Sequence, residues 1–276
     1  MLWETADPTE QLTRRFGFLD GPSAAGWVAD ALQRQWQIEV TGCDRLVISA
    51  WNAMAWVTAD DRRLIAKWSA LPQLFSNLLD AARVTTWLER CGLPVAAPIP
   101  ATDDRLLVEV PTQAEGHVHA RRPLGESRAL LGVTPVVDGD LLDSDDLGQV
   151  TDAGQMLAAV HEALAAYPDE VGGRGPRGQE QLVHNDFRSA NILHDGARVT
   201  AVLDFEEVAY GSRVADLAKS AVLLGTRYRD WGPTSEGARR ACVAAYGSCA
   251  HRPLTGTELQ ELEQRITAGL RMKGWM

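Results

Sequence analysis

The sequence contains few cysteines and no long apolar run, and each absence excludes a class of protein. Its four cysteines form no CxxC pair and have no metal-ligand spacing, so we expect neither a disulfide framework nor a cysteine-bound metal. No stretch approaches about 18 apolar residues, the length typical of a membrane span. The N-terminal segment MLWETADPTEQLTRR lacks the apolar core and cleavage site of a signal peptide. We therefore expect a soluble, cytoplasmic protein with no membrane partner.

Positive charge is also scarce. The chain has 37 acidic and 27 basic residues and a net charge of -10, whereas a protein that grips nucleic acid needs clustered Lys and Arg. We therefore expect no nucleic-acid partner. The negative charge suits a cationic small substrate, although a solvated acidic surface explains it more simply.

The rest of the composition is that of an ordinary globular protein. With 276 residues, of which 45% are hydrophobic and 23% charged, the chain suits one large domain or two modest ones. The pattern of elements changes near the middle of the chain. We predict an N-terminal lobe over residues 1–131 and a C-terminal lobe over residues 132–276.

The first lobe is predicted to be an antiparallel sheet decorated with helices. Apolar periodicity predicts helices over 23–36 and 74–91, the second ended by Gly92. The runs AMAWVTA and RRLIAKW, joined by Asp60 and Asp61, predict a hairpin. Further strands are expected at QIEV (37–40), RLVIS (45–49), RLLVEV (105–110) and ALLGVTPVV (129–137).

The second lobe is predicted to be mostly helical around a small hairpin. A strand is expected at VTAVLDF (199–205), and helices are expected over 148–166, 213–228, 234–250 and 256–271. The Gly-rich segment VGGRGPRG (171–178) lacks the GK[ST] ending of a P-loop, and it follows a predicted helix where a dinucleotide-binding loop would follow a strand. We interpret it as a flexible connection.

The stretch LVHNDFRSANILH (182–194) has an Asp and an Asn at a spacing that suits phosphoryl transfer. This reaction requires a carboxylate that orients or deprotonates the attacking hydroxyl, and ligands that hold Mg²⁺ against the phosphates. The protein-kinase catalytic loop places these functions on an Asp and an Asn separated by four residues, as Asp186 and Asn191 are here. By themselves, His184, Asp186 and Asn191 would also fit an ordinary polar turn.

A further acid strengthens the interpretation. Asp204 ends the run VTAVLDF, which follows a turn containing Asp195 and Gly196. An Asp-Gly turn favours a tight hairpin, and hairpin pairing would bring Asp204 beside the loop that carries Asn191. The combination favours a phosphotransfer site over a turn.

HNDFRSANIL followed by VLDFEEVAYGSRVADLA resembles the catalytic core of the aminoglycoside phosphotransferase and choline kinase-like superfamily, whose pattern is HxDxxxxN with a downstream DxD or DxE. The match is close over 182–220 and loose elsewhere. The resemblance implies an α+β, two-lobed protein-kinase-like fold with an antiparallel sheet lobe, a mostly helical C-terminal lobe and a nucleotide between them. By position, Asp186 would be the catalytic base or the substrate-orienting carboxylate, while Asn191 and Asp204 would hold Mg²⁺. Glu206, the second acid of DxE, would either reach the metal or be simply exposed.

Two residues in this region are expected to support the loop. The resemblance makes His184 a brace without a metal, which is also what a buried, hydrogen-bonded His would be. It makes Asp216 a residue that props the catalytic loop through backbone hydrogen bonds.

Lys67 is one of three lysines, and it lies on RRLIAKW, where kinase-like folds place the Lys that contacts the α- and β-phosphates. Two departures from the family pattern accompany it. The turn ISAWNAMAWV has no glycine, so Asn52 would have to offer its amide or backbone N–H to a phosphate. The helix expected to supply a Glu to Lys67 offers only Asp80 or, further along, Glu89.

Three other features keep two interpretations each. ALLGVTPVV resembles the hinge strand that reads the adenine edge, which makes Thr134 and Val136 nucleotide contacts, but a plain core strand also fits. The run DGDLLDSDD (138–146) is typical of a solvated loop and helix N-terminus, or it faces the substrate and attracts an amine. Trp231 fits a helix junction or the lining of a pocket.

The sequence therefore predicts a Mg²⁺-dependent kinase that transfers the γ-phosphoryl group of ATP, or another nucleoside triphosphate, to a hydroxyl of a small polar acceptor, for which a cationic molecule is one option. An antibiotic phosphotransferase of aminoglycoside type and a metabolic kinase for choline, homoserine or a sugar share every motif. A nucleotide-binding pseudokinase without turnover is the alternative of another class, suggested by the glycine-free turn. Oligomeric state and the choice between ATP and GTP stay open.

Overall fold

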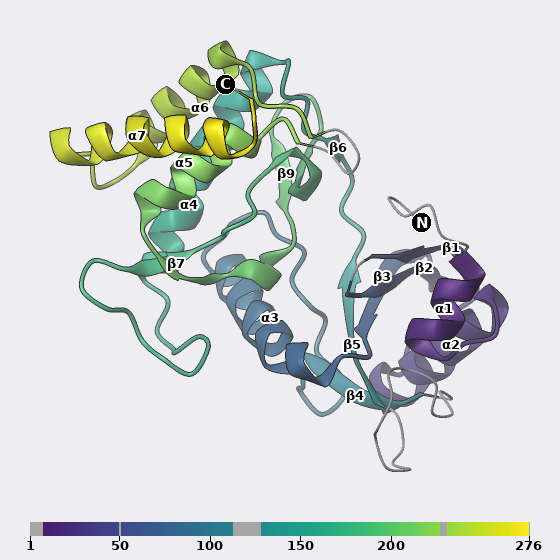
Figure 1. Cartoon of the computed structure of the whole chain (residues 1–276). Helices are drawn as coiled ribbons and strands as arrows, with labels where there is room; N and C mark the ends of the chain where they lie inside the picture. The colour runs from purple at the N-terminus through teal and green to yellow at the C-terminus, as the bar shows by residue number, and fades with distance from the viewer. Residues whose placement is uncertain (1–7, 50, 113–127, 227–230, 276) are drawn as a thin grey trace. The chain divides into compact units, whose positions relative to one another are not determined.

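The computed structural model describes residues 8–49, 51–112, 128–226 and 231–275. The chain forms two compact units: Met1–Ala82 with Ala97–Val136, and Arg83–Ala96 with Val137–Met276 (Figure 1). Of the helices in the described ranges, none is both long and apolar enough to cross a membrane.

The first unit is built on a five-stranded antiparallel sheet in the order β1-β2-β3-β5-β4 (Figure 1). The predicted hairpin is confirmed as β2 and β3, and both of its turn residues have the left-handed backbone that a two-residue turn needs, with φ of 47° at Asp60 and 62° at Asp61. The strands are β1 Gly42–Ile48, β2 Ala53–Ala59, β3 Arg62–Ser69, β4 Leu107–Pro111 and β5 Arg128–Pro135.

Two helices belong to the core of this unit, α1 Pro8–Phe16 and α2 Gly21–Trp36. The sequence predicted α2 and missed α1. Asp20 caps α2, since Asp20 Oδ1 accepts a hydrogen bond from the Ser23 amide at 2.8 Å. Trp68 of β3 packs in this core against Trp27 of α2, with ring centroids 5.5 Å apart. Side chains alternate along a strand, so Trp68 marks the core face and Lys67 the opposite face.

The strand predicted at QIEV is wrong. Residues 37–40 form no strand, because they are used to close α2. Gln37 takes a left-handed φ of 55°, and the amide of Ile38 donates to the carbonyl of Leu32 at 3.3 Å. This arrangement satisfies the end of the helix, and sheet pairing starts only at Gly42.

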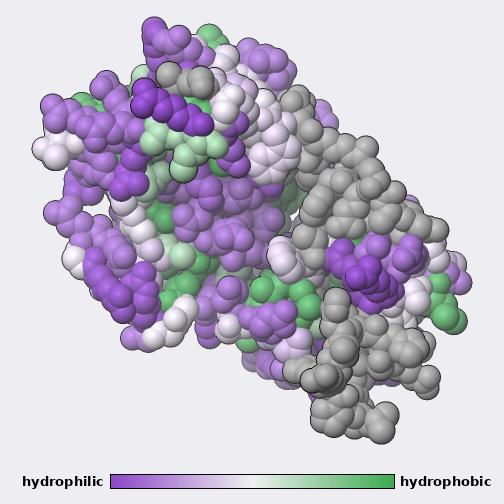
Figure 2. Space-filling model, in the orientation of Figure 1, coloured by the Kyte–Doolittle hydropathy of each residue, from purple (hydrophilic) through white to green (hydrophobic). Residues whose placement is uncertain are grey.

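The second unit is mostly helical. α4 packs against α6, and α5 packs against α7 (Figure 1). Its helices include α4 Leu147–Ala165, α5 Arg213–Leu223, α6 Glu236–Cys249 and α7 Gly256–Met272, and α3 Phe75–Arg90 spans the division between the units. α7 buries only Leu262 and Leu270, and the visible surface of the C-terminal helices is accordingly mostly hydrophilic (Figure 2).

Two small sheets complete this unit and flank the predicted catalytic loop. β6, β8 and β9 form one, and β7 pairs with β10 in the other. The bounds are β6 Asp140–Leu141, β7 Gln181–Val183, β8 Ile192–His194, β9 Val199–Val202 and β10 Ala209–Gly211.

Two predicted boundaries were too long. The strand expected over 199–205 ends at Val202, and the helix expected over 213–228 ends at Leu223 in the structure, with 227 and 228 outside the described residues. The β8–β9 hairpin itself is confirmed.

Candidate active site

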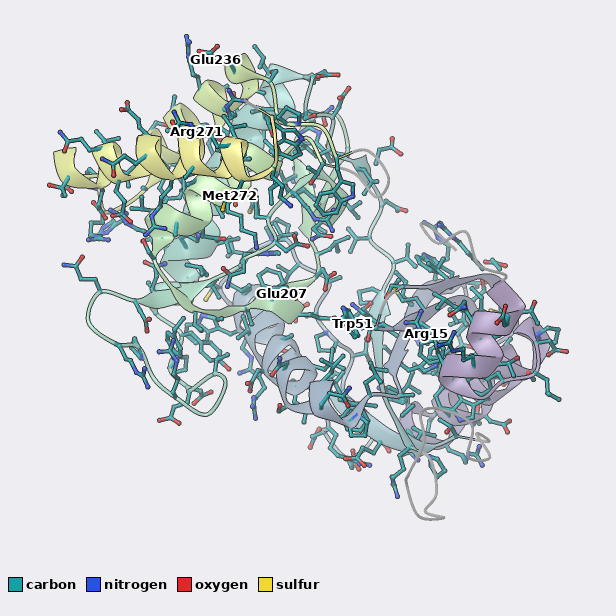
Figure 3. All side chains as sticks on the ribbon, in the orientation of Figure 1. Arg15, Trp51, Glu207, Glu236, Arg271 and Met272 are labelled. Carbon is teal, nitrogen blue, oxygen red and sulfur yellow. The ribbon has the colours of Figure 1, made fainter. Side chains whose placement is uncertain are left out.

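The loop between β7 and β8 carries the predicted catalytic residues. Its second residue, Asn185, has a left-handed φ of 63°, and the loop ends in a 3-10 turn, η2 Ser189–Asn191. The side-chain amide of Asn185 donates to the carbonyl of Glu207, a residue labelled in Figure 3, at 2.9 Å. Lys219 Nζ donates to the carbonyl of Asn185. The start of the loop is therefore held from two other segments of the same unit.

Asp186 is oriented by two side chains. Asn191 Nδ2 lies 2.7 Å from Asp186 Oδ2 and 2.8 Å from the Asp186 carbonyl, and Arg188 Nε lies 2.9 Å from Asp186 Oδ1. The Asp186 side chain is 24% exposed, so it keeps access to a substrate while its position is fixed.

Hairpin pairing of β8 and β9 brings the two predicted metal ligands, Asn191 and Asp204, close together. Asn191 lies just before β8, and its carbonyl accepts the amide of Leu203 at 2.8 Å, just past the end of β9. Asp204 follows Leu203 with a left-handed φ of 60° and is exposed. Because Asn191 Nδ2 donates to Asp186, its Oδ1 is the atom left for a cation.

This donor set fits Mg²⁺. Mg²⁺ is commonly held by one or two protein oxygen ligands together with phosphate oxygens and water, and Asn191 and Asp204 supply oxygen only. Glu206 lies in the 3-10 turn η3 Phe205–Glu207 directly after Asp204 and is half-buried. Across the described ranges, no group of three or more His, Cys, Asp or Glu residues is arranged as a metal site of another kind.

His184 ties the catalytic loop to the strand that leads to Asp204. Its Nδ1 accepts the amide of Asp186 at 3.1 Å, and its Nε2 donates to the carbonyl of Leu203 at 3.1 Å. These two bonds select the neutral ring with the proton on Nε2, since a second ring proton would face the Asp186 N–H. Burial lowers the pKa of His184 below its usual value, against the opposing effect of nearby carboxylates, with Asp216 the largest of them. The structure thus makes His184 a neutral brace.

Asp216 holds the loop from behind, as expected. One of its oxygens accepts the amide of His184 at 3.2 Å, and the other accepts the amide of Asn185 at 3.0 Å. His161 Nε2 lies 2.9 Å from Asp216 Oδ2, and His161 Nδ1 lies 3.0 Å from the Tyr246 hydroxyl. Burial alone would raise the pKa of Asp216, but the hydrogen bond and charge of His161 and the backbone amide of Asn185 outweigh it and lower that pKa.

The sequence did not identify Arg188 as a site residue. Its guanidinium bonds to Asp186 and also lies over the ring of Trp231, 5.6 Å from the centroid. Lys273 Nζ lies 5.3 Å from the same centroid. The signal that could have identified Arg188 was its basic side chain two positions after Asp186. Trp231 and Lys273 lie too far along the chain for sequence spacing to predict their contacts with this loop.

The predicted nucleotide contacts lie in the first unit. Lys67 is half-buried on β3, directly opposite Met54 and Gly132, and Thr134 lies on β5 opposite Ile65. Lys67 and Thr134 therefore share the face of the sheet away from the core.

The backbone amides of the other two predicted contacts are already hydrogen-bonded. The amide of Val136 donates to the carbonyl of Arg63 at 3.0 Å. The amide of Asn52 donates to Ser49 Oγ at 3.1 Å, and Asn52 is buried. The preceding residue, Trp51, is exposed (Figure 3). Of the two acids on α3, Asp80 is buried and Glu89 is exposed.

The fold of this chain is similar to that of several solved structures. The chain is similar to an amicoumacin kinase in complex with AMP-PNP and Ca²⁺, with 14% identity over 91% of this chain and 86% of that one and a TM-score of 0.61. It is also similar to a macrolide 2'-phosphotransferase from Brachybacterium faecium, with 18% identity over 87% of this chain and 91% of that one and a TM-score of 0.57. A spectinomycin phosphotransferase in complex with ADP and spectinomycin matches at 8% identity over 90% of this chain and 87% of that one, with a TM-score of 0.54.

At these identities the likeness establishes the fold, which confirms the predicted α+β, kinase-like class. A comparison with curated protein sequences finds no match. The family model described as "Phosphotransferase enzyme family" matches residues 117–256, which is half of the chain and includes the whole catalytic loop, Asp204 and Asp216. The chain therefore belongs to the phosphotransferase enzyme family.

Proposed function

We propose that the chain is a small-molecule kinase that transfers the γ-phosphoryl group of a nucleoside triphosphate, ATP above all, to a hydroxyl of a small polar acceptor. The observation that carries this proposal is the geometry of Asp186, which is held at both oxygens and remains accessible. The backbone bond from the Leu203 amide to the Asn191 carbonyl supports a role for Asn191 next to Asp204. The ADP and AMP-PNP in the similar structures support a nucleotide donor.

In the proposed reaction, the acceptor hydroxyl donates its hydrogen bond to a free lone pair of Asp186. The hydroxyl oxygen forms a bond to the γ-phosphorus, the bond from that phosphorus to the β–γ bridging oxygen breaks, and the hydroxyl proton passes to Asp186. Asn191 and Asp204 would hold Mg²⁺, which neutralises phosphate charge when it is bound. Lys67 would contact the α- and β-phosphates from the first unit, with Asn52, Thr134 and Val136 as further nucleotide contacts.

His184 and Asp216 contribute to this reaction by position. His184 keeps the amide of Asp186 and the carbonyl of Leu203 in one arrangement, and Asp216 keeps the preceding turn in place. Preorganisation of this kind matters because a displacement of about 1 Å can cost a large factor in rate.

The test compares the wild-type protein with Asp186→Asn and with the matched control Asp169→Asn, an exposed acid of the loop after α4. Each protein is incubated with MgATP and a panel of amino alcohols, sugars, hydroxy acids and aminoglycosides. We expect a thermal shift with MgATP in all three proteins, and turnover in the wild type and the control. Asp186→Asn should lose about 100- to 10,000-fold in rate, the usual contribution of a general base. MgATP binding without turnover of any acceptor would instead favour the pseudokinase.

A further inference from the structure

Arg188 has donors to spare beside the proposed base. A guanidinium carries five N–H donors, and only the Nε–H of Arg188 has an acceptor among the described residues, namely Asp186 Oδ1. The Arg188 side chain is only 17% exposed. A largely buried guanidinium whose terminal NH₂ groups have no acceptor in the described part of the chain is suited to bind an anion, because its planar fork matches a carboxylate or phosphate.

The position of Arg188 separates it from the proposed metal ligands. Asn191 contacts Asp186 Oδ2, whereas Arg188 contacts Oδ1. If Asn191 held Mg²⁺ against the nucleotide phosphates as proposed, the Oδ2 side of Asp186 would face the nucleotide. Arg188, on the Oδ1 side, would then face the acceptor.

Two more residues extend this cationic site. The ring of Trp231 is 48% exposed and has both the Arg188 guanidinium and Lys273 Nζ within 5.6 Å of its centroid. Lys273 ends α7, directly after Arg271 and Met272 (Figure 3). Among the residues that the structure describes, no carboxylate forms an ion pair with Lys273. Two cations thus converge on one aromatic ring beside Asp186, in a chain whose net charge is -10.

We propose that Arg188, Trp231 and Lys273 form an acceptor subsite for a negatively charged group, so that the preferred acceptor is a hydroxy acid or another hydroxyl compound with an anionic substituent. This inference rests on the proposed kinase function and names its substrate class. Arg188 keeps Nε on Asp186 and offers its terminal NH₂ groups to the anion, while Trp231 holds the plane of the guanidinium. Lys273 would repel a polycationic acceptor, because two positive charges placed next to each other in a binding site are unfavourable.

The experiment uses matched pairs of acceptors that differ in one anionic group: glycerate against glycerol, and glucuronate against glucose, with kanamycin as a polycation. The measured quantity is the ratio of kcat/KM for the anionic member to that for the neutral member. Any general effect of a substitution on Asp186 cancels in this ratio. We expect the wild type to prefer the anionic member, and Arg188→Gln and Lys273→Gln each to lower the ratio about tenfold, the effect of one lost charge-assisted hydrogen bond.

Arg174→Gln is the matched control, because Arg174 also pairs with a carboxylate, Glu180 at 2.6 Å, and also lies over an aromatic ring, Tyr210 at 5.0 Å. It should leave the ratio unchanged. Calorimetric titration of the same compounds into the MgADP-loaded protein gives the preference independently of turnover.

Equal or weaker binding and turnover of the anionic members, or a ratio that Lys273→Gln does not alter, would overturn the inference. The MgATP thermal shift in the same samples distinguishes the two failures. If MgATP binds and neutral acceptors or kanamycin turn over, the kinase function stands and only the anionic subsite is wrong. If MgATP does not bind, the proposed function fails with it.

Discussion

Asn191 holds Asp186 with a single amide group: its Nδ2 lies 2.8 Å from the Asp186 carbonyl and 2.7 Å from Asp186 Oδ2. The Asn191 side chain therefore has two functions. Its Nδ2 fixes the proposed base, and its Oδ1 remains as the oxygen that could bind a cation. The two functions make different demands on the residue. A ligand needs only an oxygen, but the bond to Asp186 needs an N–H donor.

Substitutions at Asn191 should separate these functions. Asn191→Asp keeps an oxygen ligand but places a carboxylate against Asp186 Oδ2, so we expect kcat to fall at least about tenfold while the Mg²⁺ concentration for half-maximal activity changes little. Asn191→Ala loses both functions and should raise that Mg²⁺ concentration as well. Mg²⁺ titrations of the steady-state rate test this. An identical Mg²⁺ requirement in Asn191→Ala and the wild type would exclude Asn191 as a ligand.

The buried pair of Asp216 and His161 should contribute to stability. Their side chains are 1% and 3% exposed, and Asp216 also accepts two backbone amides. Asp216→Asn would turn an NH₂ group toward one of these donors, so we expect a loss of about 1–3 kcal/mol in the free energy of unfolding. Asp152→Asn is a matched control, because Asp152 pairs with His194 at 3.0 Å but is 36% exposed. Its expected cost in urea unfolding is below about 1 kcal/mol, and equal costs for both variants would contradict the prediction.

The sequence was sufficient for those parts of the fold that local patterns specify. The β2–β3 hairpin followed from two alternating runs around Asp60 and Asp61, and α4 to α7 followed from apolar periodicity between breakers. The strand predicted at QIEV was wrong because this alternating run, with strand-favouring Ile38 and Val40, closes α2, and a helix end takes its partners from the preceding turn. Local propensity cannot decide whether such a segment forms a strand or closes the preceding helix.

The same distinction applies to the candidate site. Asp186, Asn191 and Asp204 could be predicted because a short motif and a hairpin place them together. The roles of Arg188, Trp231 and Lys273 could not, since their contacts depend on how α5 and α7 pack. His161 of α4 and Tyr246 of α6, behind Asp216, were missed because their contacts depend on how α4, α5 and α6 pack.

The neutral state of His184 predicts a loss of stability in mild acid. Its pKa is lowered from the usual 6.5, mainly by burial, so below about pH 6.5 the unfolded chain binds a proton that the native chain does not. The free energy of unfolding should then fall as pH decreases from about 6.5, by up to about 1.4 kcal/mol per pH unit. The lowered pKa of Asp216 acts in the same direction, but only as pH falls below about 3.8, so the two windows are separate.

Urea unfolding at about pH 5 and about pH 7.5 measures this effect. His184→Gln should be less stable than the wild type at the higher pH but should lose less on acidification. His251→Gln, at an exposed position, should behave as the wild type does. If His184→Gln loses as much stability as the wild type between these two pH values, His184 is not the titrating group.

Two glycines in the α4–α6 pair should respond to alanine in opposite ways. A Cβ on Gly154 of α4 would lie 2.4 Å from the carbonyl oxygen of Cys242 and 2.9 Å from Ala245 Cβ, so Gly154→Ala must push α6 away and cost about 1–3 kcal/mol. Gly247 of α6 has nothing within 4 Å of that position, and Gly247→Ala should add up to about 1 kcal/mol through helix propensity. Thermal unfolding gives both signs, and a stabilised Gly154→Ala would contradict the close packing of the two helices.

The first unit offers an independent test of nucleotide binding at Lys67. Lys67 is half-buried on the face of the sheet opposite the core, directly across from Gly132 of β5. Lys67→Met keeps the length and apolar stem of the residue and removes the charge that would contact the phosphates. We expect the thermal shift by MgATP to be largely lost, with the shape of the unfolding transition unchanged. Arg63→Met, on the same face of the same strand but exposed, should keep the shift. Equal shifts in both variants would place the phosphates away from β3.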